Sequence, residues 1–134
     1  MGKKLVRLIE VPAISTDGTL IQLQTPEIPF EIKRVYHIFG VSPGAVRGAH
    51  THKETTQILF CIQGSIIVEL DDGRKKEKIF LNKPHIGVLL EPGVWHEMQE
   101  FKKNTILLVL ASEKHEPKDY VRSYEDFLRS YAKS

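Results

Sequence analysis

Three histidines have the side-chain type and the spacing to carry out chemistry in this chain. His50 and His52 stand two residues apart, and on a β-strand that spacing sends both side chains to the same face. His96 follows a Pro-Gly turn, and a barrel closed around these segments would aim it inward near the other two. Because imidazole titrates near neutral pH and also ligates metals, the rings predict a proton-transfer pocket or a metal site. The remaining alternative is that some of them fill polar core positions.

Gln57 favours proton transfer over metal binding. The stretch from Gly44 to Gly64 has the spacing of the first cupin motif, a glycine, two histidines, an acid and a closing glycine, but Gln57 stands in place of the acid. A neutral amide is a poorer metal ligand than a carboxylate. We therefore expect no metal and no other cofactor. The alternative is a metal-dependent cupin, such as a dioxygenase, that uses His50, His52 and His96.

Tyr36 and two arginines are further candidates for the pocket. Arg34 and Tyr36 share one face of an expected strand, and Arg47 stands three residues before His50. The Tyr36 phenol could donate a proton to an oxyanion, or it could pack across strands. A guanidinium suits phosphate or carboxylate groups, although a lone arginine is more often a solvated surface residue. Three other histidines are expected to play no part in the site: His37, His85 and His115.

Short strands must position these residues. Apolar and β-branched runs recur at regular spacing, separated by turn residues, and seven or eight such strands predict an all-β sandwich or barrel. The tail differs, because apolar residues from Tyr120 to Tyr131 recur at helical spacing and predict an amphipathic helix of about three turns. We expect this helix to pack across the barrel or a dimer partner. The expected strands include 20–24, 30–39, 56–63, 66–70, 74–81, 86–90, 94–98 and 105–111.

The composition is typical of one soluble domain, residues 1–134. The net charge is +2 with both signs interspersed, which gives no basis for nucleic-acid binding. Cys61 is the only cysteine, lies in an apolar strand and fits buried packing in a reducing cytosol. The sequence shows no signal peptide and no apolar run near the roughly 20 residues that a membrane span needs. We expect a cytoplasmic protein that does not bind membranes.

Several blocks, taken together, resemble one family. They are IKRVYHIF (32–39), VRGAHTHK (46–53), QGS (63–65), LDDG (70–73), PGVWHEM (92–98), LAS (110–112) and DYVRSYEDF (119–127). In this order they are similar to the thymidine-diphosphate-linked (dTDP) 4-keto-6-deoxyglucose 3,4-ketoisomerases, over about residues 28 to 131. The resemblance implies a cupin jelly-roll barrel with a C-terminal α-helix. It also implies an isomerase that moves the keto group of dTDP-4-keto-6-deoxy-D-glucose from C4 to C3, for 3-amino-3,6-dideoxyhexose biosynthesis.

The resemblance also implies roles for the candidate residues. The reaction passes through an enediolate without a metal or redox cofactor: His50 shuttles the proton, His52 assists or orients, and Tyr36 handles the oxygen-bound protons. We expect Arg34 and Arg47 to hold the diphosphate or the sugar. The other expected substrate contacts are Gln57, Trp95 and His96. Family members are dimers that exchange N-terminal strands, so a homodimer is expected. An epimerase on the same nucleotide sugar is the nearest rival, because it also begins with proton abstraction beside a carbonyl.

Overall fold

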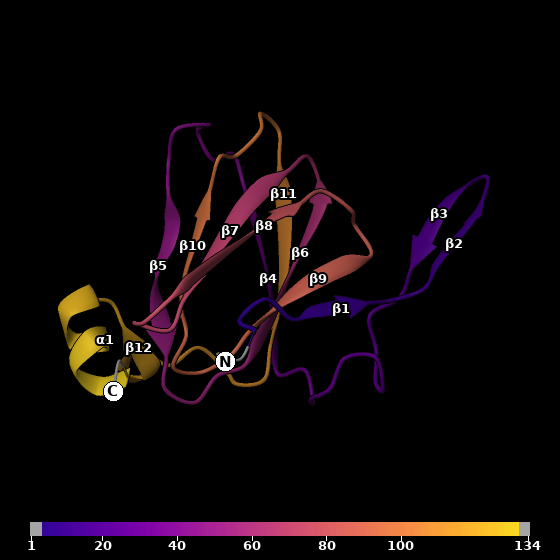
Figure 1. The fold of residues 1–134 in the computed structure, drawn as a ribbon. Helices are drawn as coiled ribbons and strands as arrows, with labels where there is room; N and C mark the ends of the chain where they lie inside the picture. The colour runs from indigo at the N-terminus through magenta and orange to yellow at the C-terminus, as the bar shows by residue number, and fades with distance from the viewer. Residues whose placement is uncertain (1–3, 132–134) are drawn as a thin grey trace.

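Two five-stranded antiparallel sheets face each other in the computed structural model, which describes residues 4–131 (Figure 1). The strand order is β1-β9-β6-β11-β4 in the first sheet and β12-β5-β10-β7-β8 in the second. This arrangement confirms the expected all-β jelly roll. The strands are β1 Leu8–Glu10, β4 Arg34–Phe39, β5 Arg47–His52, β6 Gln57–Gln63, β7 Ile66–Asp71, β8 Lys76–Leu81, β9 Ile86–Leu90, β10 Trp95–Gln99, β11 Ile106–Ala111 and β12 Tyr120–Val121.

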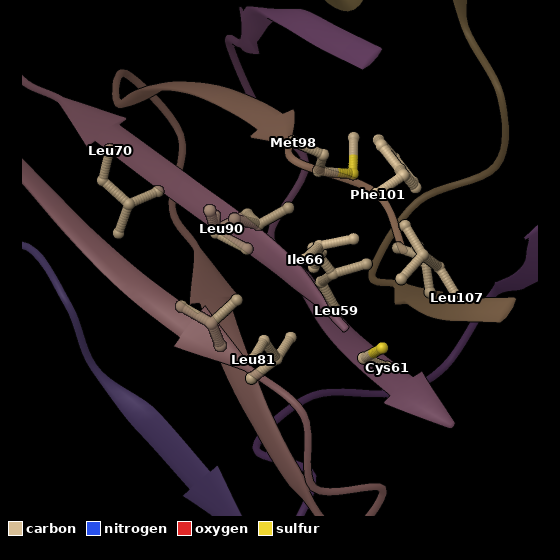
Figure 2. Packing of buried hydrophobic residues seen from close by; sticks show 12 residues of the cluster. Leu59, Cys61, Ile66, Leu70, Leu81, Leu90, Met98, Phe101 and Leu107 are labelled. Atoms are coloured by element: carbon tan, nitrogen blue, oxygen red, sulfur yellow. The ribbon is translucent and has the colours of Figure 1, made fainter. Parts of the chain in front are cut away.

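The main hydrophobic core fills the space between the two sheets. Figure 2 shows Leu59, Ile66 and Leu90, from three different strands, meeting in this cluster. Burial of these side chains is the main source of stability in such a fold. Cys61 belongs to the same cluster and is 1% exposed. Because burial raises the pKa of its thiol to about 11, Cys61 stays protonated and packs as an apolar residue, as expected.

The strand β6 is buried on both faces, which explains its continuous apolar run. Ile58 and Phe60 point away from the main core into a second cluster, where Ile28 and neighbouring residues of the segment before β4 cover them. Successive side chains on a strand alternate between faces, so Gln57 and Leu59 point the other way, between the sheets. The segment before β4 thus keeps water from the outer face of β6, and Gln57 lies on the inner face, between the sheets.

The C-terminal helix is shorter than the sequence predicts. The apolar spacing predicts a helix from Tyr120, but α1 spans Tyr124–Tyr131, and Tyr120 lies on β12, which pairs with β5. Ser123 caps the helix: its hydroxyl accepts a hydrogen bond from the Asp126 N–H at 3.3 Å, and its carbonyl accepts one from the Phe127 N–H at 3.0 Å. Within residues 4–131 no helix is long and apolar enough to cross a membrane.

A small hairpin near the N-terminus projects away from the two sheets (Figure 1). It consists of β2, Ala13–Thr16, and β3, Gly18–Ile21, with Asp17 at the turn, so the strand expected over 20–24 begins and ends earlier. Two of its apolar side chains lack cover within the described chain: Ile14 is 55% exposed and Leu20 is 53% exposed. An isolated two-stranded hairpin is marginally stable in water.

Candidate active site

A cavity of about 360 Å³ is lined by residues of both sheets. The strand β4 contributes Arg34, Tyr36 and Ile38, which are the half-buried members of an alternating pattern, so the expected common face is confirmed. The lining has an apolar part and a polar part. The apolar part includes Leu59, Leu90, Met98 and Val109. The polar part consists of Arg34, Tyr36, Arg47, His50, Gln57, His96, Tyr120 and Arg122.

The three predicted histidines lie together at this cavity. His50 and His52 are on β5, and His96 on the neighbouring strand β10 is the direct partner of His50 in the pairing. The ring centroid of His50 is 4.9 Å from that of His52 and 4.7 Å from that of His96. His50 and His96 line the cavity, whereas His52 is buried behind them. The structure thus brings together side chains that are far apart in the sequence.

The backbone before His50 fixes the protonation pattern of its ring. Gly48 and Ala49 have φ values of +82° and +58°, in the left-handed region. A Cβ on Gly48 would lie 3.1 Å from the His96 carbonyl oxygen, so the close approach of β5 to β10 requires glycine. The Nδ1 of His50 donates to the Gly48 carbonyl oxygen at 3.1 Å, because a carbonyl can only accept. In the neutral ring the basic lone pair is therefore on Nε2.

Burial and neighbouring positive charge keep all three imidazoles neutral at pH 7. Burial and the Arg122 guanidinium lower the pKa of His50 to about 4. Burial and the adjacent His50 lower the pKa of His52 to about 4. The pKa of His96 lies well below its ordinary value, again because of burial first and the other two rings second. A neutral imidazole can accept a proton, so the cluster is ready to act as a base.

Tyr36 and Gln57 form the opposite wall of the cavity, on the first sheet. Burial raises the pKa of the Tyr36 phenol, although the Gln57 amide and the Arg34 guanidinium beside it act in the other direction. The phenol is therefore protonated at pH 7 and can donate. Gln57 is fully buried, and apart from this interaction with the Tyr36 phenol its amide atoms have no hydrogen-bond partner among the described residues. A buried amide without a partner is costly, and a polar ligand in the cavity would satisfy it.

The histidine cluster could hold a cation only through neutral nitrogen atoms. One nitrogen from each of His50, His52 and His96 lies within 4.8 Å of the others. The Asp119 carboxylate raises the pKa of His52, but it is held by the Glu54 N–H at 2.7 Å and by the Thr55 hydroxyl. With Gln57 in the acid position, no carboxylate of the motif supplements the three imidazoles. The donor set fits a metal less well than a set that includes an acid.

The structure does not place Trp95 with the other predicted site residues. Trp95 is 5% exposed and is absent from the cavity lining. Its ring contacts Tyr124 and Phe127 of α1, at centroid distances of 5.2 and 5.5 Å, and its Nε1 donates to Glu97. Trp95 therefore packs between its strand and α1 in this structure, and its expected substrate contact stays a prediction. Trp95 follows the alternation of β10, in which its neighbour His96 faces the cavity.

Two polar side chains of the cavity are not predicted by the sequence. Tyr120 lies on β12 with its ring 5.0 Å from that of His50 and 4.6 Å from that of His52. The Arg122 guanidinium stacks over the Tyr120 ring at 4.3 Å and also lines the cavity. The capping residue Ser123 was the available signal, because a helix that begins after it leaves Tyr120 and Arg122 outside.

A jelly roll of antiparallel strands with histidines turned into its interior defines a cupin. The RmlC epimerase of Mycobacterium tuberculosis has this fold: its TM-score is 0.73 over 87% of this chain and 67% of its own, at 16% identity. That similarity concerns the fold alone.

The family within the cupins is given by closer matches. The family model described as "FdtA: WxcM-like, C-terminal" matches residues 1–132. The TDP-4-oxo-6-deoxy-alpha-D-glucose-3,4-oxoisomerase of Aneurinibacillus thermoaerophilus is 41% identical over 134 residues, covering 99% of this chain and 95% of its own. The chain belongs to this family of sugar 3,4-ketoisomerases, as the sequence blocks predict.

Solved structures agree with this assignment. QdtA, a sugar 3,4-ketoisomerase from Thermoanaerobacterium thermosaccharolyticum in complex with TDP, has a TM-score of 0.92 and 38% identity, over 96% of this chain and 95% of its own. A histidine-to-asparagine mutant of QdtA was solved with TDP-4-keto-6-deoxyglucose. The WlaRB TDP-quinovose 3,4-ketoisomerase of Campylobacter jejuni has a TM-score of 0.89 and 43% identity, over 96% and 100% of the two chains. These comparisons support the ketoisomerase and not the dioxygenase or epimerase alternatives.

Proposed function

We propose that this chain converts TDP-4-keto-6-deoxyglucose into its 3-keto isomer by proton transfer. The observation that carries the proposal is the cavity itself, in which the neutral His50 on one sheet faces the protonated Tyr36 phenol on the other. A base and an oxygen-bound proton donor are the two groups that an enediolate reaction needs. The 41% identity to a TDP-sugar 3,4-oxoisomerase supports the same substrate class.

The reaction requires no net oxidation. Nε2 of His50 removes the proton from C3 of the sugar, and the electrons of the C–H bond form a C3–C4 double bond while the C4 carbonyl becomes an enediolate oxygen. Tyr36 donates its proton to that oxygen and takes the proton of the C3 hydroxyl, so a C3 carbonyl forms. The imidazolium of His50 then returns a proton to C4. We assign His52 to supporting the His50 ring, since the two rings are in contact.

The polar groups that remain in the cavity suit the rest of the substrate. Gln57 and His96 line it, and we propose that they contact the sugar. Arg34, Arg47 and Arg122 supply three guanidinium groups, which bind phosphate oxygens through paired hydrogen bonds. We propose that Arg47 and Arg122 hold the diphosphate. Their charges lower the pKa of His50, so a bound diphosphate would offset them and make His50 more basic.

This coupling predicts different pH profiles for the free enzyme and the complex. The base must be neutral, so activity is lost as the pH falls through its pKa. We expect kcat/KM, which reports the free enzyme, to fall only near the His50 pKa of about 4. We expect the acidic limb of kcat to lie at higher pH, because it reports the diphosphate-bound state. Steady-state rates between about pH 3 and 8, at pH values where the enzyme stays folded, measure both limbs, and coincident limbs would contradict the coupling.

Proton NMR in deuterated water tests the proposed function directly. The substrate is TDP-4-keto-6-deoxyglucose, and the protein is treated with a chelator beforehand. We expect a 3-keto sugar with deuterium at C4, and the C4 coupling constant gives the configuration there. A spectrum in which C3 exchanges its proton but no 3-keto sugar forms would point to an epimerase. Full recovery of activity only after a metal is added would point to the metal-dependent alternative.

The hairpin of β2 and β3 favours a homodimer. Its exposed Ile14 and Leu20 need an apolar partner, and the resemblance implies exchange of N-terminal strands between subunits. We propose that the hairpin docks on a second copy of the chain. We also propose that the enzyme works in the cytoplasm, where Cys61 stays reduced. Light scattering after size exclusion should give twice the 15.3 kDa chain mass. The change of Ile14 and Leu20 to serine should shift the protein to monomer, and a monomeric wild type would refute the proposal.

A further inference from the structure

The guanidinium of Arg34 has one nitrogen with a hydrogen-bond partner and one without. Its guanidinium lies over the Tyr36 ring at 5.1 Å, and its Nη1 donates to Nδ1 of His115 at 3.0 Å. Its Nε is buried and has no hydrogen-bond partner among the described residues. Arg34 lines the cavity, so its guanidinium lies where it can take part in binding an anionic group.

One ring nitrogen of His115 lies within hydrogen-bond distance of side chains from both sheets. An arginine can only donate, so Nδ1 of His115 must be the acceptor, and the ring is then neutral with its proton on Nε2. The Tyr120 hydroxyl lies 3.2 Å from the same Nδ1, so Arg34 and Tyr120 share its single lone pair as donors. Arg34 belongs to β4 of the first sheet, and Tyr120 belongs to β12 of the second. His115 is therefore a shared acceptor between the sheets, although its place in a loop gave no sign of a role.

We infer that His115 is a positioning residue, which holds Arg34 and Tyr120 in the orientation that the sugar nucleotide requires. The inference rests on the proposed function for the identity of the substrate. A free arginine side chain samples many rotamers, and fixing it before binding lowers the entropy lost on association. Tyr120 in turn packs on the His50 and His52 rings. His115 therefore affects the position of Arg34 directly and the position of His50 through Tyr120.

Substitutions of His115 separate this role from a general structural one. His115→Leu removes the acceptor, and we expect kcat/KM to fall about tenfold, mainly through a higher KM. His115→Asn keeps an acceptor oxygen close to the position of Nδ1, and we expect it to stay within about threefold of wild type. In an Arg34→Ala background, His115→Leu should add little, because both changes remove the same contact. His37→Leu is the matched control, since His37 is exposed on the outer face of β4.

The outcomes are distinct. Wild-type kinetics in His115→Leu would overturn the inference, and so would an equal loss in His115→Asn and His115→Leu. Nitrogen-15 NMR of the His115 ring gives a reading that does not depend on turnover: we expect the Nε2–H tautomer and a shift of the Nδ1 resonance in Arg34→Ala. A proton on Nδ1, or no shift, would contradict the inference. A wild type without turnover would overturn the proposed function, and the NMR result would still decide the role of His115.

Discussion

Replacement of His50 by asparagine is expected to lower kcat by about 10²- to 10⁴-fold, the usual contribution of a positioned general base. The side-chain N–H of asparagine can still donate to the Gly48 carbonyl, as Nδ1 of His50 does at 3.1 Å. It has no nitrogen that titrates, so the C3 proton has no acceptor. Turnover and the exchange of substrate protons in deuterated water should fall together, while the thermal unfolding midpoint stays close to that of wild type.

The comparison variant for His50→Asn is His37→Asn, which makes the same change on the exposed face of β4. It should keep wild-type activity. If His50→Asn turned over substrate at the wild-type rate, the base would have to be another member of the cluster. His52→Asn and His96→Asn would then identify it, because each removes one ring from the set of three.

Replacement of Tyr36 by phenylalanine is expected to lower kcat by about 10²- to 10³-fold with little change in KM. The phenol lines the cavity, and burial raises its pKa, so it donates a proton to the enediolate oxygen rather than carrying a charge. Phenylalanine keeps the ring that lies under Arg34 and removes only the hydroxyl. Single-turnover kinetics with bound substrate would measure the effect on the chemical step.

Tyr124→Phe is the matched control for Tyr36→Phe. The Tyr124 hydroxyl donates to the Asp71 carboxylate at 2.7 Å and is absent from the cavity lining, so its loss should leave kcat unchanged. If Tyr36→Phe raised KM and left kcat unchanged, the hydroxyl would contribute to binding only. The proton transfers at oxygen would then belong to another donor, and Tyr120 is the other phenol at the cavity.

The strands and most of the polar site could be predicted because alternation is a local rule. The inward face of β4 follows from the spacing of Arg34, Tyr36 and Ile38, and the pair His50 and His52 follows from the same rule on β5. The rule also places Trp95 on the opposite face to its neighbour His96, so the two residues were not expected to share a face of β10. Resemblance to a motif is a weaker guide to orientation than position along a strand.

The part of the second-sheet wall that β12 forms could not be predicted in the same way, because it depends on pairing between distant segments. Tyr120 has an apolar spacing that continues into α1, and only its pairing opposite His52 shows that it belongs to a strand. The role of His115 depends on the distance between two sheets at one loop. Such contacts are set by tertiary structure and leave no periodic trace in the sequence.

The unsatisfied amide of Gln57 has a consequence for how such enzymes arise. The codons for glutamine and glutamate differ in a single base, so one mutation would place a carboxylate at this buried position in the same cavity as His50 and His96. That carboxylate would complete the acid and histidine set that metal-binding cupins use, and it would also hold protons that the isomerase must move. A single base change therefore separates the donor set of this barrel from one that includes an acid.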